Sequence, residues 1–331
     1  MADHGRFVWY ELTTTDIQSG QAFYSAVVGW GTRDASMPGM PYTVFTAGEA
    51  SVCGMMELPK EAREMGERPM WIGYVCVDDV DAVADRVKQL GGSVHVAPQD
   101  VLDFSRFSIV SDPQMATFAL FKRRRPSQEP PMNLLAQGCI GWHELITADG
   151  DEAWAFYSKL FGWQKAEVTK SSVGAYQQFS AAGQTIGGMM TKPPTVPECC
   201  WLYYFNVGDI DAAVKRVKAN GGQLLSGPME VLGRNWIVQC ADPQGAMFAL
   251  SGYRGFGYFE RVDRGGSGRR GFQTHPYRAG RSRSSATPTA RLRPVWPDTE
   301  TGCSATLTLD PPTSTLAPSP TAKVAWPVAP A

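Results

Sequence analysis

Two carboxylates occupy the same place in two similar segments of this chain, each two residues after a tryptophan. The pairs are Trp9 with Glu11 and Trp142 with Glu144. Residues i and i+2 of a β-strand share a face, so each pair would place a carboxyl group beside an indole. A carboxyl group that loses hydration has a raised pKa and can transfer protons. Glu11 and Glu144 are therefore the candidate catalytic residues. The alternative is that each accepts hydrogen bonds and holds its strand in place.

Two arginines are candidates for binding an anionic ligand or for pairing with the glutamates. Arg106 and Arg234 each lie just before the last two strands expected in their segments. The alternative is that each is an exposed arginine at a strand edge. They do not align, because Arg106 matches Trp236, so we expect two clefts of different chemistry. The other candidate ligand-binding residues are apolar, aromatic or histidine: Trp9, Tyr42, Phe45, Trp71, Trp142, His143, Tyr176, Phe179 and Trp201. The alternative is that most of these are ordinary core residues without a role in binding.

Several common chemistries have no motif in this sequence. There is no Ser-His-Asp arrangement, phosphate-binding loop, dinucleotide-binding glycine pattern or His-Glu-x-x-His motif. The seven cysteines match no zinc or redox spacing, and we interpret most of them as small buried hydrophobic residues. The sequence thus predicts no organic cofactor.

The elements that must position the candidates are repeated at an offset of about 130 residues. The repeated motifs include Trp9-Tyr10-Glu11-Leu12 with Trp142-His143-Glu144-Leu145, Asp79-Val80-Asp81-Ala82 with Asp209-Ile210-Asp211-Ala212, and Asp112-Pro113-Gln114 with Asp242-Pro243-Gln244. Matches that keep their order over a whole module indicate two copies of one domain.

Each copy has the pattern strand, helix and three strands, twice. In the first copy, alternation and turn residues predict strands near 6–14, 30–36, 41–47, 51–57, 70–77, 93–97, 104–111 and 115–122, with a charged, Pro-containing loop at 58–69. Asp16 and Asp79 are predicted N-caps of two helices, and Gly91 is a predicted left-handed C-cap. The fold class is α+β, with a cleft between the two halves of each copy.

These motifs resemble the vicinal oxygen chelate superfamily of glyoxalase I, bleomycin-resistance proteins and extradiol dioxygenases, and in tandem form a bacterial subgroup of it. The resemblance covers about residues 6–122 and 139–251. It implies that each copy is a pair of βαβββ units forming a curled mixed sheet. It also implies that the two copies pack together as an intramolecular pseudo-dimer, since single-copy relatives associate in pairs.

Metal-dependent members of this superfamily take His and Glu ligands from the first and last strand of each half. At those positions this chain has Trp9 and Ala119 in one copy, and Trp142 and Ala249 in the other. A divalent metal is therefore disfavoured. The leading hypothesis is metal-free binding of a small organic molecule. A metal-dependent lyase or dioxygenase and an inactive scaffold are the alternatives.

The composition of the sequence indicates the domain boundaries, the nature of the tail, the partners and the location. We expect a first domain at 1–125, a linker at 126–138, a second domain at 139–254 and a tail at 255–331. The tail is rich first in Arg and then in Pro and Thr, which is typical of disorder; a basic arm or an extension of the reading frame are the alternatives. The two copies are acidic, with no reason to expect nucleic acid as a partner. No apolar run predicts a membrane segment and no signal peptide is visible, so we expect a cytoplasmic location.

Overall fold

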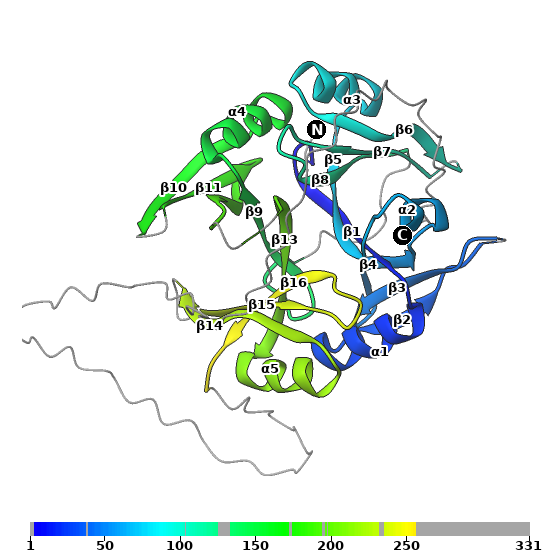
Figure 1. Ribbon diagram of the computed structural model, residues 1–331, viewed down its shortest axis with the longest axis vertical. Helices are drawn as coiled ribbons and strands as arrows, with labels where there is room; N and C mark the ends of the chain where they lie inside the picture. The colour runs from blue at the N-terminus through cyan, green and yellow to red at the C-terminus, as the bar shows by residue number, and fades with distance from the viewer. Residues whose placement is uncertain are drawn as a thin grey trace, which may run out of the picture.

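The computed structural model describes residues 3–37, 39–102, 104–124, 133–171, 174–193, 196, 198–231 and 235–255, and Figure 1 shows how their elements are arranged. The predicted tail lies outside the described residues except for its first position, and so does most of the predicted linker. None of the described helices is long and apolar enough to cross a membrane.

The first copy consists of two βαβββ units. Its first unit contains β1 (Phe7–Thr14), α1 (Ile17–Val28), β2 (Gly31–Asp34), β3 (Tyr42–Ala47) and β4 (Ala50–Glu57). Its second unit contains β5 (Met70–Cys76), α3 (Val80–Gln89), β6 (Ser93–Val101), β7 (Ser105–Ser111) and β8 (Thr117–Arg123). The predicted order of elements is confirmed. The segment expected to be a loop between the units also contains a short helix, α2 (Lys60–Glu64).

The second copy repeats this order. Its first unit contains β9 (Ile140–Thr147), α4 (Gly150–Phe161), β10 (Gln164–Ser171), β11 (Gly174–Ala181) and β12 (Gln184–Thr191). Its second unit contains β13 (Cys200–Asp209), α5 (Ile210–Ala219), β14 (Gln223–Val231), β15 (Asn235–Ala241) and β16 (Met247–Tyr253).

Local sequence fixes where the longer helices begin and end. The side chains of Asp16, Asp79, Asp149 and Asp209 each accept a backbone N–H of the first turn, which satisfies a donor that has no partner inside the helix. Gly91, just beyond α3, has a φ of 88°, a left-handed conformation that glycine adopts without steric cost. The predicted caps are confirmed.

Each copy forms one curled eight-stranded sheet. The strand order of the first is β2-β3-β4-β1-β5-β8-β7-β6, with β1 and β5 antiparallel at the centre, and the second sheet has the same order. Tyr42 of β3 and Phe107 of β7, near opposite edges, belong to one buried cluster, because the sheet curls around it. We name this concave face the first cup and the equivalent face of the second sheet, around Glu144, the second cup.

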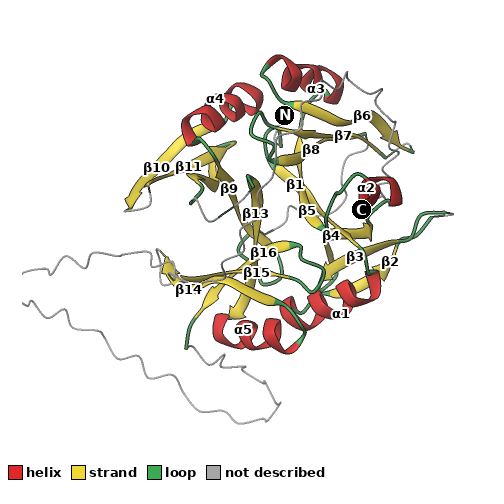
Figure 2. Ribbon diagram, in the orientation of Figure 1, coloured by secondary structure: helices red, strands yellow, loops and turns green. Residues whose placement is uncertain are grey.

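The other face of each sheet, its back face, packs against the other copy. At one end of this contact the Tyr24 hydroxyl of α1 donates to Asp242 Oδ2 at 3.1 Å, and at the other the Tyr157 hydroxyl of α4 donates to Asp112 Oδ2 at 3.0 Å. Helix α1 consequently lies beside α5, and α4 lies beside α3 (Figure 2). These paired contacts are consistent with the intramolecular pseudo-dimer expected from the repeat.

Equivalent residues of the two copies meet at the centre of this contact. Tyr10 is hydrogen-bonded to His143, its counterpart in the repeat, and the Tyr203 hydroxyl oxygen accepts the backbone N–H of its counterpart Gly73 at 2.7 Å. A Cβ at position 73 would lie 2.6 Å from that hydroxyl oxygen. The close approach of Tyr203 therefore leaves room for a glycine but not for a side chain at this position. The two copies have therefore become complementary rather than identical at their contact.

The tyrosine–aspartate bonds between the copies predict a measurable contribution to stability. Tyr24→Phe removes the donor to Asp242 and the acceptor of the Trp71 indole N–H, which approaches the Tyr24 hydroxyl to 2.8 Å. We expect a loss of about 1–3 kcal/mol in the free energy of unfolding, because buried polar groups lose their partners. Denaturant titration measures it. Tyr157→Phe should cost a similar amount, whereas Tyr253→Phe at an exposed position should change stability by less than about 0.5 kcal/mol. Equal stability of the three variants would contradict this account.

Candidate functional site

The first cup is built around a buried carboxylate with two phenolic partners. Glu11 Oε2 accepts from the Tyr42 hydroxyl at 2.8 Å, and Oε1 accepts from the Tyr74 hydroxyl at 2.9 Å. The Trp9 indole N–H donates in turn to the Tyr42 oxygen at 3.3 Å. Gly54, opposite Glu11 on β4, leaves the space in which the Tyr42 ring lies. Indole, phenols and carboxylate thus form one hydrogen-bonded chain.

Large apolar side chains close the first cup. Phe107 and Phe121 are paired across β7 and β8, and their rings lie 6.4 and 6.1 Å from the ring of Tyr74. Val96 and Ile109 are paired across β6 and β7 and belong to the same buried cluster. Glu11 is 0% exposed as a result.

Burial dominates the electrostatics of Glu11. Loss of hydration raises the pKa of Glu11 from 4.5 to about 7, although the hydrogen bonds from Tyr42 and Tyr74 act in the opposite direction. The carboxyl group is therefore close to its midpoint near neutral pH.

The second cup keeps the same polar chain with one addition. Glu144 Oε2 accepts from the Tyr204 hydroxyl at 2.7 Å and from the Gln239 amide at 3.2 Å. The Trp142 indole N–H donates to the Tyr176 oxygen at 2.8 Å. Burial raises the pKa of Glu144, while hydrogen bonds from Tyr204, Tyr176 and Gln239 lower it. Burial also raises the pKa of Tyr176 and of Tyr204, so both phenols act as proton-bearing donors.

The residues that close the first cup are replaced in the second. Because strand registers match, Phe107 and Phe121 correspond to Ile237 and Ser251, which are paired across β15 and β16. Val96 and Ile109 correspond in the same way to Ser226 and Gln239. The second cup therefore has smaller or polar side chains at the positions where apolar side chains fill the first cup.

The second cup is consequently less completely closed than the first, and in this sense we call it open. Its fully buried apolar cluster consists of Ile146, Leu202, Tyr204 and Ala249. Trp142, Tyr176 and Met190 are partly exposed, whereas their counterparts Trp9, Tyr42 and Met56 are buried. Glu144 itself is 6% exposed. A carboxyl group, two phenols and a carboxamide thus lie close together beside partly exposed apolar side chains.

Four aromatic residues predicted to bind ligand lie on the back faces instead. Trp71 donates to the Tyr24 hydroxyl and Trp201 to the Tyr157 hydroxyl. Phe45 and Phe179 belong to the cluster between the two copies. The expectation that Tyr42 and Phe45 both face the cleft is wrong, and so is the same expectation for Tyr176 and Phe179. Residues three apart in a strand point to opposite faces.

Two of the predicted polar ligand-binding residues, His143 and Arg106, also lie away from the cups. His143 contacts Tyr10 and the Ile186 carbonyl on the back face, where burial lowers its pKa to about 4. Arg106 donates to Asp81 and Asp100 at the surface, so it binds neither Glu11 nor an anion in the cup. Arg234 lies outside the described residues.

Sequence reasoning missed three residues that contact the carboxylates. Tyr74 and Tyr204 are paired with Trp9 and Trp142 across the central antiparallel strands, so strand pairing was the signal that could have found them. Gln239 is a buried amide between Val238 and Cys240 in β15, and a buried amide needs a hydrogen-bonding partner.

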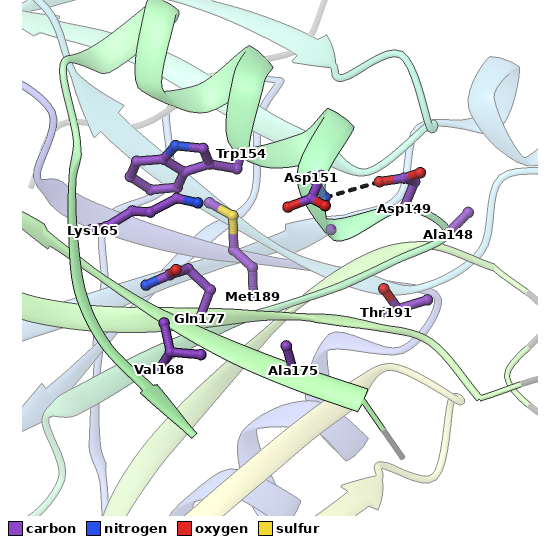
Figure 3. A pocket seen from close by; sticks show the side chains of 11 residues that line it. Ala148, Asp149, Asp151, Trp154, Lys165, Val168, Ala175, Gln177, Met189 and Thr191 are labelled. Carbon is purple, nitrogen blue, oxygen red and sulfur yellow. Dashed lines mark hydrogen bonds between the residues drawn. The ribbon is translucent and has the colours of Figure 1, made fainter. Parts of the chain in front are cut away.

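A surface cavity of about 330 Å³ lies elsewhere, between α4 and strands β10–β12 on the back face of the second sheet. Figure 3 shows Trp154, Lys165 and Met189 among its lining residues, with the Lys165 amine over the indole of Trp154 at 5.3 Å. Neither Trp142 nor Glu144 lines it, so it is separate from the second cup.

The donor sets of the two cups do not fit a divalent metal ion. Within the described ranges, no group of three or more His, Cys, Asp and Glu side chains is placed to hold one. Each carboxylate is surrounded by protonated phenols that donate to it. His143, the neighbour of Glu144, points to the opposite face of the sheet. Among the residues that the structure describes, Glu144 thus has no second carboxylate or imidazole beside it with which to bind an ion.

The doubled βαβββ units and their cups define the class of protein. The family model of the Glyoxalase/Bleomycin resistance protein/Dioxygenase superfamily matches residues 6–120 and 139–250. The chain belongs to this superfamily, as a tandem two-domain member.

Relatives share most of this chain outside the tail. It is 34% identical over 245 residues to the protein CFP32 of Mycobacterium tuberculosis, a match that covers 73% of this chain and 92% of the relative. It is 28% identical to the anthracycline biosynthesis protein DauV of Streptomyces sp. strain C5, over 74% of this chain and 92% of DauV.

Solved structures show the same fold at low identity. Homoprotocatechuate 2,3-dioxygenase from Arthrobacter globiformis aligns with a TM-score of 0.55 and 15% identity, covering 76% of this chain and 80% of that one. The 2,3-dioxygenase LapB from Pseudomonas sp. KL28 aligns with a TM-score of 0.53 and 12% identity, covering 78% and 96%. At this identity the likeness extends to the fold alone.

The raised pKa of Glu11 predicts a specific dependence of stability on pH. Between about pH 4.5 and 7 the unfolded chain has lost a proton that the folded chain still holds, so stability falls as pH rises through this window. Glu11→Gln removes this contribution. We expect the difference in unfolding free energy between wild type and Glu11→Gln to change by about 3 kcal/mol from pH 4 to pH 8, in favour of the variant.

Denaturant titration at a series of pH values measures this difference. Glu64→Gln, at an exposed helix position, serves as the control and should follow the wild type throughout. A constant difference between wild type and Glu11→Gln would show that Glu11 titrates normally in the folded protein.

Proposed function

We propose that the second cup binds a small organic molecule with an aromatic or apolar frame and at least one polar group, without a metal ion, and that the first cup has a structural role. One observation carries this proposal. The polar chain is kept in both copies, but the apolar side chains that fill the first cup are replaced by Ile237, Gln239, Ser251 and Ser226 in the second.

The lining of the second cup matches such a ligand. Trp142, Met190 and Ile237 offer partly exposed apolar surface, while Glu144 and Gln239 offer fixed hydrogen-bonding groups. Binding sites for small molecules are commonly concave and mostly apolar, with a few polar groups that set orientation. The partly exposed indole of Trp142 also provides a flat surface for an aromatic ring.

The relatives support an aromatic ligand. DauV, and DnrV of Streptomyces peucetius at 27% identity, are both named as anthracycline biosynthesis proteins, and anthracyclines are polycyclic aromatic compounds. The donor sets of the cups disfavour the metal-dependent lyase or dioxygenase alternative. The scaffold alternative fits the closed first cup better than the open second one.

Refilling the second cup with the residues of the first should abolish binding. The variant Ile237→Phe/Ser251→Phe introduces the side chains that stand at the aligned positions 107 and 121. Using 2-naphthol as a probe and quenching of tryptophan fluorescence as the measurement, we expect the affinity to fall at least about tenfold, or 1.4 kcal/mol. Met65→Phe, a similar enlargement at an exposed side chain, is the matched control and should bind like the wild type.

The same titration in the presence of EDTA tests the proposal of metal-free binding. We expect unchanged affinity, because no cluster of ligands for a divalent ion surrounds Glu144 in the described part of the chain. Loss of binding with EDTA, restored by a divalent ion, would overturn the metal-free proposal. Equal binding by the refilled variant would show that the second cup is not the site.

A further inference from the structure

We propose that two molecules of this protein associate through the exposed face of α4 in each. The surface consists of Glu152, Ala155 and Lys159 of α4 together with Met115 of the turn before β8, and we call it the α4 patch. The partner is a second molecule of the same protein, related to the first by a twofold axis. This contact is separate from the cups and from the contact between the two copies within one chain.

Two opposite charges lie on the exposed face of α4, two helical turns apart. Glu152 and Lys159 are both exposed, and the small side chain of Ala155 is exposed between them. Residues i, i+3 and i+7 share one face of a helix. The ion pairs among the described residues all involve other side chains. Both charges are therefore available to a partner.

This pattern of charges is complementary to itself. When two α4 helices pack antiparallel and cross at Ala155, Glu152 of each molecule lies opposite the partner's Lys159. A twofold contact forms every such pair twice. The alanine at the crossing point lets the two helix axes approach closely, because little side chain separates them.

An apolar groove of about 290 Å³ runs beside the charged face of α4. Leu90 at the end of α3 and Pro113 form one side of it, and Ala155 and Phe156 of α4 form the other. Figure 2 shows the two helices side by side. Burial of this apolar surface would supply most of the affinity, while the charge pairs would set the orientation of the two molecules.

Met115 is an exposed apolar side chain on a strained backbone. Its φ is 72° and its side chain is 63% exposed, whereas its counterpart in the repeat is Gly245, with a φ of 94°. The neighbouring Gln114 side chain donates to the Asp149 carbonyl at 2.9 Å and accepts the Asp149 N–H, which fixes this turn against the start of α4. A methionine in the left-handed region costs free energy that a glycine does not. Burial of the side chain against a second molecule would offset this cost.

The equivalent surface at the other end of the molecule, between α1 and α5, has none of these features. Ser19 and Ala26 of the repeat occupy the positions of the two charges. Gly245 replaces the exposed methionine, and Asn220 replaces the leucine of the groove. One self-complementary patch on each molecule gives a closed dimer rather than a growing chain of molecules.

Sedimentation velocity of the full chain over a range of concentrations tests this inference. We expect a monomer–dimer equilibrium of the wild type with a dissociation constant on the order of 10 µM, because the patch is small. Glu152→Lys and Lys159→Glu should each raise this constant at least about tenfold, since each places like charges opposite one another twice. Lys218→Glu, the same charge reversal at an exposed position of α5, is the matched control and should leave the constant unchanged.

Exchanging the two charges distinguishes pairing from a general loss of stability. Glu152→Lys/Lys159→Glu should restore the wild-type dissociation constant to within about threefold, because opposite charges again face each other. An equimolar mixture of the two single variants should form heterodimers for the same reason. Both exchanges oppose the dipole of α4, so the double variant should unfold at the lowest denaturant concentration of the set. Its recovered association could then not arise from a more stable fold.

Met115→Gly should affect folding and association in opposite directions. Glycine removes the strain of the left-handed backbone, so the midpoint of denaturant unfolding should rise at a concentration where the protein is monomeric. The dimer should weaken at least about tenfold, because the buried apolar side chain is lost. A wild type that stays monomeric at about 100 µM would overturn the inference. So would a dimer that neither charge reversal weakens, or an exchange of charges that fails to restore association.

Discussion

Both faces of each central strand are buried in this protein, and this constraint governs the rest of the structure. One face of β1 contributes Tyr10 and Leu12 to the core between the copies, while the other contributes Trp9 and Glu11 to the first cup. Because side chains alternate along a strand, each position belongs either to the contact between copies or to a cup. A buried carboxylate on the cup face then requires donors, which Tyr42 and Tyr74 provide.

The two copies have diverged on both faces in ways that fit their different surroundings. On the back face, equivalent positions meet each other, so identical large side chains would collide; Gly73 opposite Tyr203 avoids this. On the cup face the equivalent positions do not meet each other. The copies differ there in the side chains that fill the cup: Phe107 and Phe121 close the first cup, and the smaller Ile237 and Ser251 occupy the same positions in the second. The first copy thus resembles a packed core, and the second has smaller or polar side chains around the same polar groups.

The fold could be predicted from the sequence because its signals are local or repeated. The N-cap aspartates, Gly91 and the alternating strands each act over a few residues, and the repeat showed every element twice. The glutamate–tryptophan pairs could also be predicted, since they depend only on strand periodicity. The placement of Phe45, Trp71, Phe179 and Trp201 could not, because an apolar residue in a strand with two buried faces suits either one.

The sequence by itself therefore determined the doubled βαβββ units, their caps and the carboxylate beside an indole in each copy. Only the tertiary structure decided which cup is open, because the groups that fill or line it come from β6–β8 and β14–β16, far along the chain from β1 and β9. It also decided that His143 faces the other copy and that Arg106 pairs with surface aspartates. Side-chain identity at one position does not specify its partners when pairing across a curled sheet selects them.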